Sequence, residues 1–494
     1  MPRSAKENTA NTANATTATA KKTRSIRRER QGRASSMRGA LTAWLSRPLA
    51  SFHLILAVFG LLTVLGLIMV LSASSVESYS KEGSSYSVFV KQLAYTLVGL
   101  VLFWLILRMP LRMIRRMTLV FMGISVVLLV LVLLPGLGAK LNGAQSWFKI
   151  GPVSFQPVEP AKIALALWGA HVLATKRALL HQWRHILVPV MPAALLMFAL
   201  LMLQPDLGST VTLVIIVLAL LWFAGAPMRL FGVLALGAAT GFGVLAVTAG
   251  YRLDRLTSFF DPENASGDSV YQASQALYAL ADGGLFGVGL GQGSAKWRYL
   301  PNVHNDFIFA VIGEELGLVG CLLVLTLFGL LAYSGLRIAM RNTDPWIRLV
   351  SATFTVWLVA QAAINMGYVV GLLPVTGLQL PLISSGGTSQ VMTMVVFGLL
   401  ANYARHEPEA VAALRSLGPG RVGRLLRLPA PEPYRPPARR RTARAGVPPK
   451  PAGRPAVHRG SATHQLDDRR RTRRNPAAAD ARRRGNWRQG QDYR

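Results

Sequence analysis

The chain has 494 residues, of which 51% are hydrophobic, and it carries a formal net charge of +32 at pH 7. A soluble chain of this length usually divides into several domains, but here the apolar residues form long runs between polar segments. The single cysteine, Cys321, excludes an intramolecular disulfide and a cysteine metal cluster.

Several apolar runs reach about 20 residues, the length at which a helix crosses a bilayer core of about 30 Å. The runs are continuous and do not alternate with polar residues, which argues against a β-barrel. The pattern therefore predicts an all-α polytopic membrane protein.

Residues 1–48 precede the first apolar run and are polar and rich in Ala, Thr and Arg. This composition predicts a disordered basic tail, with an organelle transit peptide as the weaker alternative. The first apolar run starts too late and is too long for a cleavable signal peptide.

Ten transmembrane helices are predicted, and they define a membrane domain over residues 49–404. They lie at residues 52–73, 88–108, 117–134, 160–176, 186–203, 208–224, 229–250, 306–336, 346–372 and 388–404. With ten spans, basic residues of the short loops, such as Arg112, Lys176 and Arg341, fall on the same side as both basic tails. The positive-inside rule makes that side cytoplasmic.

Two polar segments are expected on the outer face within the first half of the chain. In the first, Glu159 and Lys162 are three residues apart at a helix start and so share one face. They form either a structural ion pair or part of a site. In the second, Asp206 lies in a tight turn and can cap the sixth span.

The segment between the seventh and eighth spans, residues 251–305, is predicted to be a large extracytoplasmic loop, and loops of this length are usually functional. Residues 271–280 are expected to form a short amphipathic helix within it. The Gly-rich run at 283–291 has G-x-G spacing but follows no strand, so it does not indicate a dinucleotide site. Such a run lets backbone approach a ligand or the membrane surface closely.

The end of this loop is the richest polar segment of the chain. Asp306 lies at the membrane boundary close to Lys296 and His304. It is either a helix-capping acid, or a general base or metal ligand that faces outward, and nearby cations and the helix N-terminus favour its ionised form. Glu314 and Glu315 lie deeper and need partners, for which a basic side chain of a neighbouring span is expected.

A fourth polar segment, residues 374–389, has no charge but many hydroxyl groups and glycines, among them Ser385. This composition suits a pocket wall or an anion-binding nest at a helix start.

Residues 405–494 are rich in Arg, Pro and Ala and are predicted to form a disordered, extended cytoplasmic tail. Its charge favours an anionic lipid surface or an acidic cytoplasmic partner. Nucleic-acid binding is the least favoured role. Without a folded domain that recognises bases, such binding would be nonspecific and sensitive to salt.

These motifs together resemble the SEDS family (shape, elongation, division and sporulation), and the resemblance covers residues 52–404. It rests on Gln156-Pro157-x-Glu159, Gln204-Pro205-Asp206-Leu207-Gly208, Lys296-x-x-Tyr299-Leu300-Pro301-x-x-His304-x-Asp306-Phe307, Gly313-Glu314-Glu315-Leu316-Gly317, Pro374-x-Thr376-Gly377 and Ser385-Gly386-Gly387. Lys296 and Tyr299 are more similar to the cell-division member of the family than to the elongation member.

The resemblance implies a peptidoglycan glycosyltransferase of the bacterial cytoplasmic membrane, acting at the division septum. It would polymerise lipid II and release undecaprenyl diphosphate. It would work with a class B penicillin-binding protein transpeptidase and other division-site proteins. The resemblance leaves open whether the reaction needs a divalent cation, Mg²⁺ or Mn²⁺. Asp306 is its only candidate ligand.

The resemblance also assigns roles to individual residues. Asp306 matches the essential acid of the family, which acts as the proposed base. The substrate-binding candidates are Lys296, Arg252, Arg255, His304, Glu159, Lys162 and Ser385. Asn302, Asn305 and Ser385 depart from the commoner pattern, which puts substrate contacts in doubt more than the reaction. A lipid II flippase and a scaffold for a transpeptidase remain the alternative functions.

Overall fold

The computed structural model describes residues 45–141, 144–151, 153–176, 183–237, 268–297 and 303–434, together with Gly39 and Ala43. These residues all lie in one compact unit, Met1–Pro436. Arg252, Arg255, nearly all of the predicted N-terminal tail and the C-terminal tail beyond Tyr434 lie outside the described residues.

Nine of the ten predicted spans coincide with helices of the described residues. These are α2 (Ala50–Glu82), α3 (Ser87–Arg108), α4 (Leu111–Leu131), α5 (Val158–Thr175), α6 (Trp183–Leu203), α7 (Leu207–Phe223), α11 (Ile308–Arg341), α12 (Pro345–Val369) and α13 (Thr388–Arg405). The seventh predicted span is described only as far as Gly237, where it is helical from Met228. Within the described ranges, α2, α3, α4, α11 and α12 are long and apolar enough to cross a membrane.

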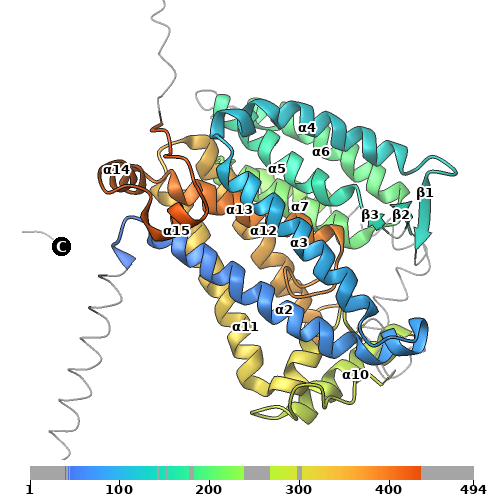
Figure 1. The fold of residues 1–494 in the computed structure, drawn as a ribbon. Helices are drawn as coiled ribbons and strands as arrows, with labels where there is room; N and C mark the ends of the chain where they lie inside the picture. Colours follow the sequence, from blue (N-terminus) through green and yellow to red (C-terminus); the bar gives the residue numbers. More distant parts are fainter. Residues whose placement is uncertain are drawn as a thin grey trace, which may run out of the picture. The chain divides into compact units, whose positions relative to one another are not determined.

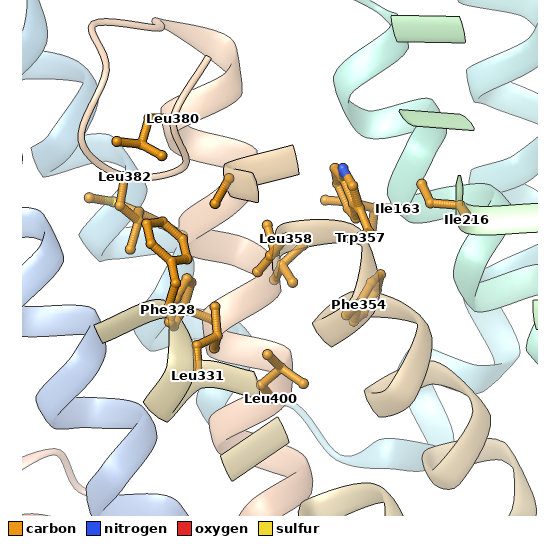
Figure 2. Packing of buried hydrophobic residues seen from close by; sticks show 14 of the residues in the cluster. Ile163, Ile216, Phe328, Leu331, Phe354, Trp357, Leu358, Leu380, Leu382 and Leu400 are labelled. Carbon is orange, nitrogen blue, oxygen red and sulfur yellow. The ribbon is translucent and has the colours of Figure 1, made fainter. Parts of the chain in front are cut away.

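The helices pack through small residues and a continuous apolar core. Figure 1 shows α3 beside α13, with α2 between them and α11. Gly398 allows α13 to approach α3, because a Cβ there would lie 3.0 Å from the Phe103 carbonyl oxygen. Further along the core, Trp357 of α12 faces Ile163 and Ile216 of two neighbouring helices (Figure 2).

A small antiparallel sheet lies between α4 and α5 and was not predicted. It has the order β1 (Gly138–Leu141), β2 (Ala144–Ile150) and β3 (Val153–Phe155). The membrane domain is all-α, as predicted, and the sheet is a local addition in the segment that joins two of the helices. The signal was in the sequence, because Asn142-Gly143 between two short alternating runs is typical of a two-residue hairpin turn.

The outer loop contains the predicted amphipathic helix, which is α10 (Asp268–Gly283). The glycine-rich run after it lies against a break in α11, where Gly317 has φ 66° and ψ −164°. The Val288 amide donates to the Glu314 carbonyl at 2.9 Å, and the Leu318 amide donates to the Gly284 carbonyl at 3.0 Å. The loop thus supplies partners for backbone groups that the broken helix leaves unpaired.

The tail was predicted to be disordered from residue 405, but the residues that directly follow α13 are folded. Two short helices, α14 (Pro408–Ser416) and α15 (Gly420–Leu425), follow α13 directly. Ala410, Leu414 and Leu428 are buried. The Arg and Pro content concealed these few apolar positions. In Figure 1, α14 and α15 lie at the end of the helix bundle away from the sheet.

Candidate functional site

The four polar segments expected on the outer face meet at one cavity of about 940 Å³. The first contributes the sheet and Gln156, and the second contributes the turn at Asp206. Asp306 comes from the third, and the fourth contributes residues from Thr376 to Gly387. Segments that are far apart in sequence therefore form a single polar pocket, which α3 closes on a further side.

Asp306 lies in the turn that precedes α11 and is half-buried. Two side chains of α12 hold its backbone carbonyl: Asn365 Nδ2 donates at 2.8 Å and Tyr368 Oη at 2.7 Å. On the opposite wall, a Cβ on Gly377 would lie 3.8 Å from Asp306 Oδ2. The carboxylate is thus fixed by its backbone at the cavity, close to the positive end of a helix.

Asp206 caps α7, as predicted, and also ties two walls together. Its Oδ1 accepts from the Ser209 amide at 2.9 Å, and its Oδ2 accepts from Ser209 Oγ at 2.7 Å. Gln156 Nε2 donates to Oδ2 at 3.0 Å. Because these three donors use both carboxylate oxygens, Asp206 is a structural acid of the cavity wall.

The third and fourth segments are joined directly. The Ser385 amide donates to the His304 carbonyl oxygen at 3.0 Å, and both Ser385 and Asp306 line the cavity. The His304 imidazole turns instead to α2, where its Nδ1 lies 3.0 Å from Glu77 Oε2. His304 therefore supports the turn that carries Asp306.

Two lysines of the cavity wall were missed by the sequence analysis. Lys91 belongs to α3 and pairs with Glu82 at 2.6 Å, and Lys149 is exposed on β2. Lys91 is hidden in an apolar run that reads as a plain span. Lys149 would have been found from its alternation with Trp147, since alternate residues of a strand share one face.

Glu159 and Lys162 form the predicted ion pair, with Lys162 Nζ 2.9 Å from Glu159 Oε1. Both side chains are buried, with Lys162 2% and Glu159 8% exposed. Lys162 Nζ also lies 5.1 Å from the ring centroid of Trp357. The pair is enclosed where α5 meets α12, and neither residue lines the cavity of about 940 Å³.

Lys296 was expected to contact substrate, but the structure places it in the protein interior. Its Nζ lies 3.4 Å from Glu315 Oε1 and also donates to the Gly291 carbonyl. Ser72 Oγ of α2 donates to the same carboxylate at 2.6 Å. Glu315 thus has the basic partner expected for it, which comes from the outer loop and not from a span.

Glu314 has a different set of partners. It accepts from Ser294 Oγ at 2.9 Å and from the Ala295 amide at 3.2 Å. Backbone and hydroxyl donors therefore replace the predicted basic side chain. Together, Glu314 and Glu315 fix the loop that leads to Asp306.

A metal site needs several ligand side chains close together. Within the ranges that the structure describes, no three His, Cys, Asp or Glu side chains come together as a metal site would require.

Comparisons with known proteins agree over the membrane domain. The family model described as "Cell cycle protein" (FTSW_RODA_SPOVE) matches residues 52–409. The "Probable peptidoglycan glycosyltransferase FtsW" of Mycobacterium tuberculosis is 56% identical over 395 residues, which are 80% of this chain and 75% of that protein. "Stage V sporulation protein E" of Bacillus subtilis is 38% identical, over 70% of this chain and 94% of that protein.

Solved structures give the same result. The "Rod shape determining protein RodA" of Thermus thermophilus aligns with a TM-score of 0.53 and 29% identity, covering 72% of this chain and 96% of that chain. A second match is a chain from a structure titled "Structural coordination of polymerization and crosslinking by a peptidoglycan synthase complex". It aligns with a TM-score of 0.59 and 28% identity, covering 72% of this chain and 97% of that chain.

Proposed function

Since the chain belongs to the FtsW, RodA and SpoVE family, which is the SEDS family, we propose that its outer cavity polymerises lipid II with Asp306 as the general base. The chain is a peptidoglycan glycosyltransferase and a multi-pass membrane protein. Its identity of 56% to mycobacterial FtsW confirms the predicted similarity to the cell-division member.

The observation that carries the proposal is the position of Asp306. A half-buried carboxylate lies at a polar cavity of about 940 Å³ in which four separate segments meet. The acceptor sugar hydroxyl attacks the anomeric carbon of the donor while its proton passes to the Asp306 carboxylate. The bond from that carbon to the diphosphate breaks, and undecaprenyl diphosphate leaves with the electron pair. An ionised carboxylate suffices as the base because the diphosphate is a good leaving group.

The diphosphate needs cationic partners near the reacting carbon. Lys149 meets this need best among the described residues, because its side chain is exposed on β2 and lines the cavity. Lys91 lines it too, but it is already paired with Glu82. Lys296 is enclosed with Glu315. We assign the diphosphate contact to Lys149, with Lys91 as a second cation once Glu82 is displaced.

The decisive experiment compares Asp306→Asn with the wild type. Each protein is purified with its cognate class B penicillin-binding protein and given labelled lipid II. We expect Asp306→Asn to lower the rate of polymerisation by about 10² to 10⁴, the usual contribution of a general base. Asp282→Asn is the matched control, because Asp282 is an exposed acid of α10 outside the cavity. A normal rate for folded Asp306→Asn would end the assignment of Asp306.

The remaining features of the proposal follow from charge and from the family. Ten spans with both basic tails in the cytoplasm put the cavity outside the membrane. The protein then acts in the bacterial cytoplasmic membrane at the septum, with a class B penicillin-binding protein and other division-site proteins. The tail beyond Tyr434 binds anionic lipid or an acidic cytoplasmic protein. If the reaction uses a divalent cation, Asp306 would help to hold it, and the cation would neutralise negative charge on the leaving diphosphate.

Lipid II flipping is the alternative, and it requires a polar path through the helices. The described residues that line the cavity all come from the outer ends of the spans and the segments that join them there. This arrangement supports a reaction at one face more than a transport path. Vesicles that expose lipid II to an external reagent without forming polymer would favour the flippase.

A further inference from the structure

A second cavity, of about 630 Å³, lies at the other end of the helix bundle. It is formed where α3 turns into α4, where α12 begins and where α13 ends. The segment Pro429–Tyr434, which follows α15, lines its remaining side. By the charge rule this end of the bundle faces the cytoplasm, and the reaction does not use it.

The charged lining of this cavity is predominantly basic. It contains Arg108, Arg112, Arg115 and Arg405, against the two carboxylates of Asp344 and Glu432. His406 adds no charge at neutral pH, because burial lowers its pKa to about 4. Two positive charges therefore remain in excess in a cavity large enough for a small ligand.

The four arginines are not equally committed to the protein. Arg115 lies 3.5 Å from Asp344, and Arg405 donates to the Pro429 carbonyl at 2.6 Å. Arg108 lies over the Trp104 ring at 4.5 Å, a contact that leaves its N–H groups available. Arg112 is 74% exposed, and its partner Glu432 is 59% exposed. Arg108 and Arg112 are thus the two that can bind an anion.

The contact between Arg112 and Glu432 indicates what kind of ligand fits. Glu432 Oε2 lies 2.8 Å from Arg112 Nη2, so a carboxylate on the C-terminal segment already occupies an anion position at the cavity. The segment is held by this pair, by Arg405 donating to the Pro429 carbonyl and by the buried Pro431, and just before it Trp104 Nε1 donates to the Leu426 carbonyl at 3.1 Å. An external anion needs only to displace one exposed carboxylate.

The cavity also opens beside an apolar surface. Its lining includes Leu107 and Leu111, and on the same helices Leu105 and Met113 are 44% and 50% exposed. An apolar face next to a group of arginines at a membrane boundary matches a phospholipid, whose phosphate and acyl chains lie one above the other. A soluble phosphate compound would have no use for the apolar side.

We propose that this cavity binds the phosphate headgroup of an anionic phospholipid of the inner leaflet, held by Arg108 and Arg112 in competition with Glu432. The lipid replaces the Glu432 carboxylate on Arg112 and its acyl chains lie along α3 and α4. The C-terminal segment is thereby released from Arg112 when the lipid is bound. The proposal does not depend on the reaction assigned to the outer cavity.

The test is native mass spectrometry of the full-length protein in detergent, titrated with phosphatidylglycerol or with phosphatidylcholine. We expect one phosphatidylglycerol to be retained well above the others, and phosphatidylcholine to be retained poorly. The double variant R108Q/R112Q should lose about 30-fold in affinity, roughly fivefold for each arginine at the surface. Arg116→Gln is the matched control, because Arg116 is exposed on the same helix but does not line the cavity.

Glu432→Gln provides a second, independent measurement, because an exposed side chain can be changed without unfolding the protein. It should raise the affinity for phosphatidylglycerol several-fold by removing the competing carboxylate. Equal retention by wild type, R108Q/R112Q and Glu432→Gln would overturn the proposal, as would equal retention of the two lipids. If glycerol phosphate at equal concentration displaced the lipid, the site would bind a soluble phosphate compound, and the assignment to a phospholipid would be wrong.

Discussion

Replacing Lys296 by Met distinguishes a structural lysine from a substrate-binding one. The side chains of Lys296 and Glu315 are 5% and 0% exposed, and their charged atoms are 3.4 Å apart. Removing one partner of a buried ion pair usually costs about 3–5 kcal/mol, because the other charge remains without compensation. The hydrogen bond from Ser72 Oγ to Glu315, 2.6 Å long, does not involve Lys296 and should remain in the variant. We therefore expect a loss of stability of about 3 kcal/mol, at the lower end of that range.

The assay is thermal unfolding of the purified chain in detergent, with lipid II polymerisation measured on the same samples below the transition. Lys296→Met should lower the Tm by several degrees. The double variant K296M/E315Q should recover part of the loss, because no unpaired charge is then left in the interior. Lys149→Met is the matched control, since Lys149 is exposed at the cavity. It should impair polymerisation and leave the Tm unchanged.

One result would refute this reasoning. If Lys296→Met kept the wild-type Tm and lost polymerisation as completely as Asp306→Asn, Lys296 would act on substrate, as the sequence first suggested. The ion pair with Glu315 would then be a resting arrangement that substrate breaks.

Three further predictions concern the outer cavity and its support. Gly287→Ala should lower the Tm and the yield of folded protein, because Gly287 has φ +82° and a Cβ there would overlap the Glu315 carbonyl. Gly232 has open space around it, so the control Gly232→Ala should change neither the Tm nor the yield. Asp206→Ala should cost about 1–2 kcal/mol of stability in thermal unfolding through loss of the α7 cap, and a Tm equal to wild type would contradict the cap. If Asp306 helps to hold a catalytic cation, chelation by EDTA should slow polymerisation and added Mg²⁺ should restore it; a rate unaffected by EDTA would remove the cation from the reaction.

The spans were predictable because length and hydropathy decide them, but the helix ends were not. The first span was predicted to end at residue 73, whereas α2 continues to Glu82. Hydropathy marks the part of a helix that lies in lipid, and a helix can continue into water beyond it. The third span was predicted from 117, whereas α4 starts at Leu111. Its first turn contains Arg112, whose side chain is 74% exposed and can keep its charged end in water while its stem covers apolar surface.

The meeting of the four polar segments was only partly predictable. Sequence identified Asp306, Asp206 and Ser385, because polar groups at membrane boundaries are costly unless they are used. It did not reveal which cations face the cavity. Lys296 and Lys149 are both lysines of outer segments, and only tertiary packing makes one an interior partner of Glu315 and leaves the other exposed.

The break in α11 has a consequence for how this part of the protein opens. Carbonyl and amide groups that are released within hydrocarbon find no water, so exposing them costs several kcal/mol each. The amides of Val288 and Leu318 are bonded across the break, to Glu314 and Gly284. The glycine-rich run and α11 cannot separate without both losing these hydrogen bonds. The two amides should therefore exchange their hydrogens with one common opening free energy. The turn with Asp306 leads directly into α11, the helix whose break this contact closes.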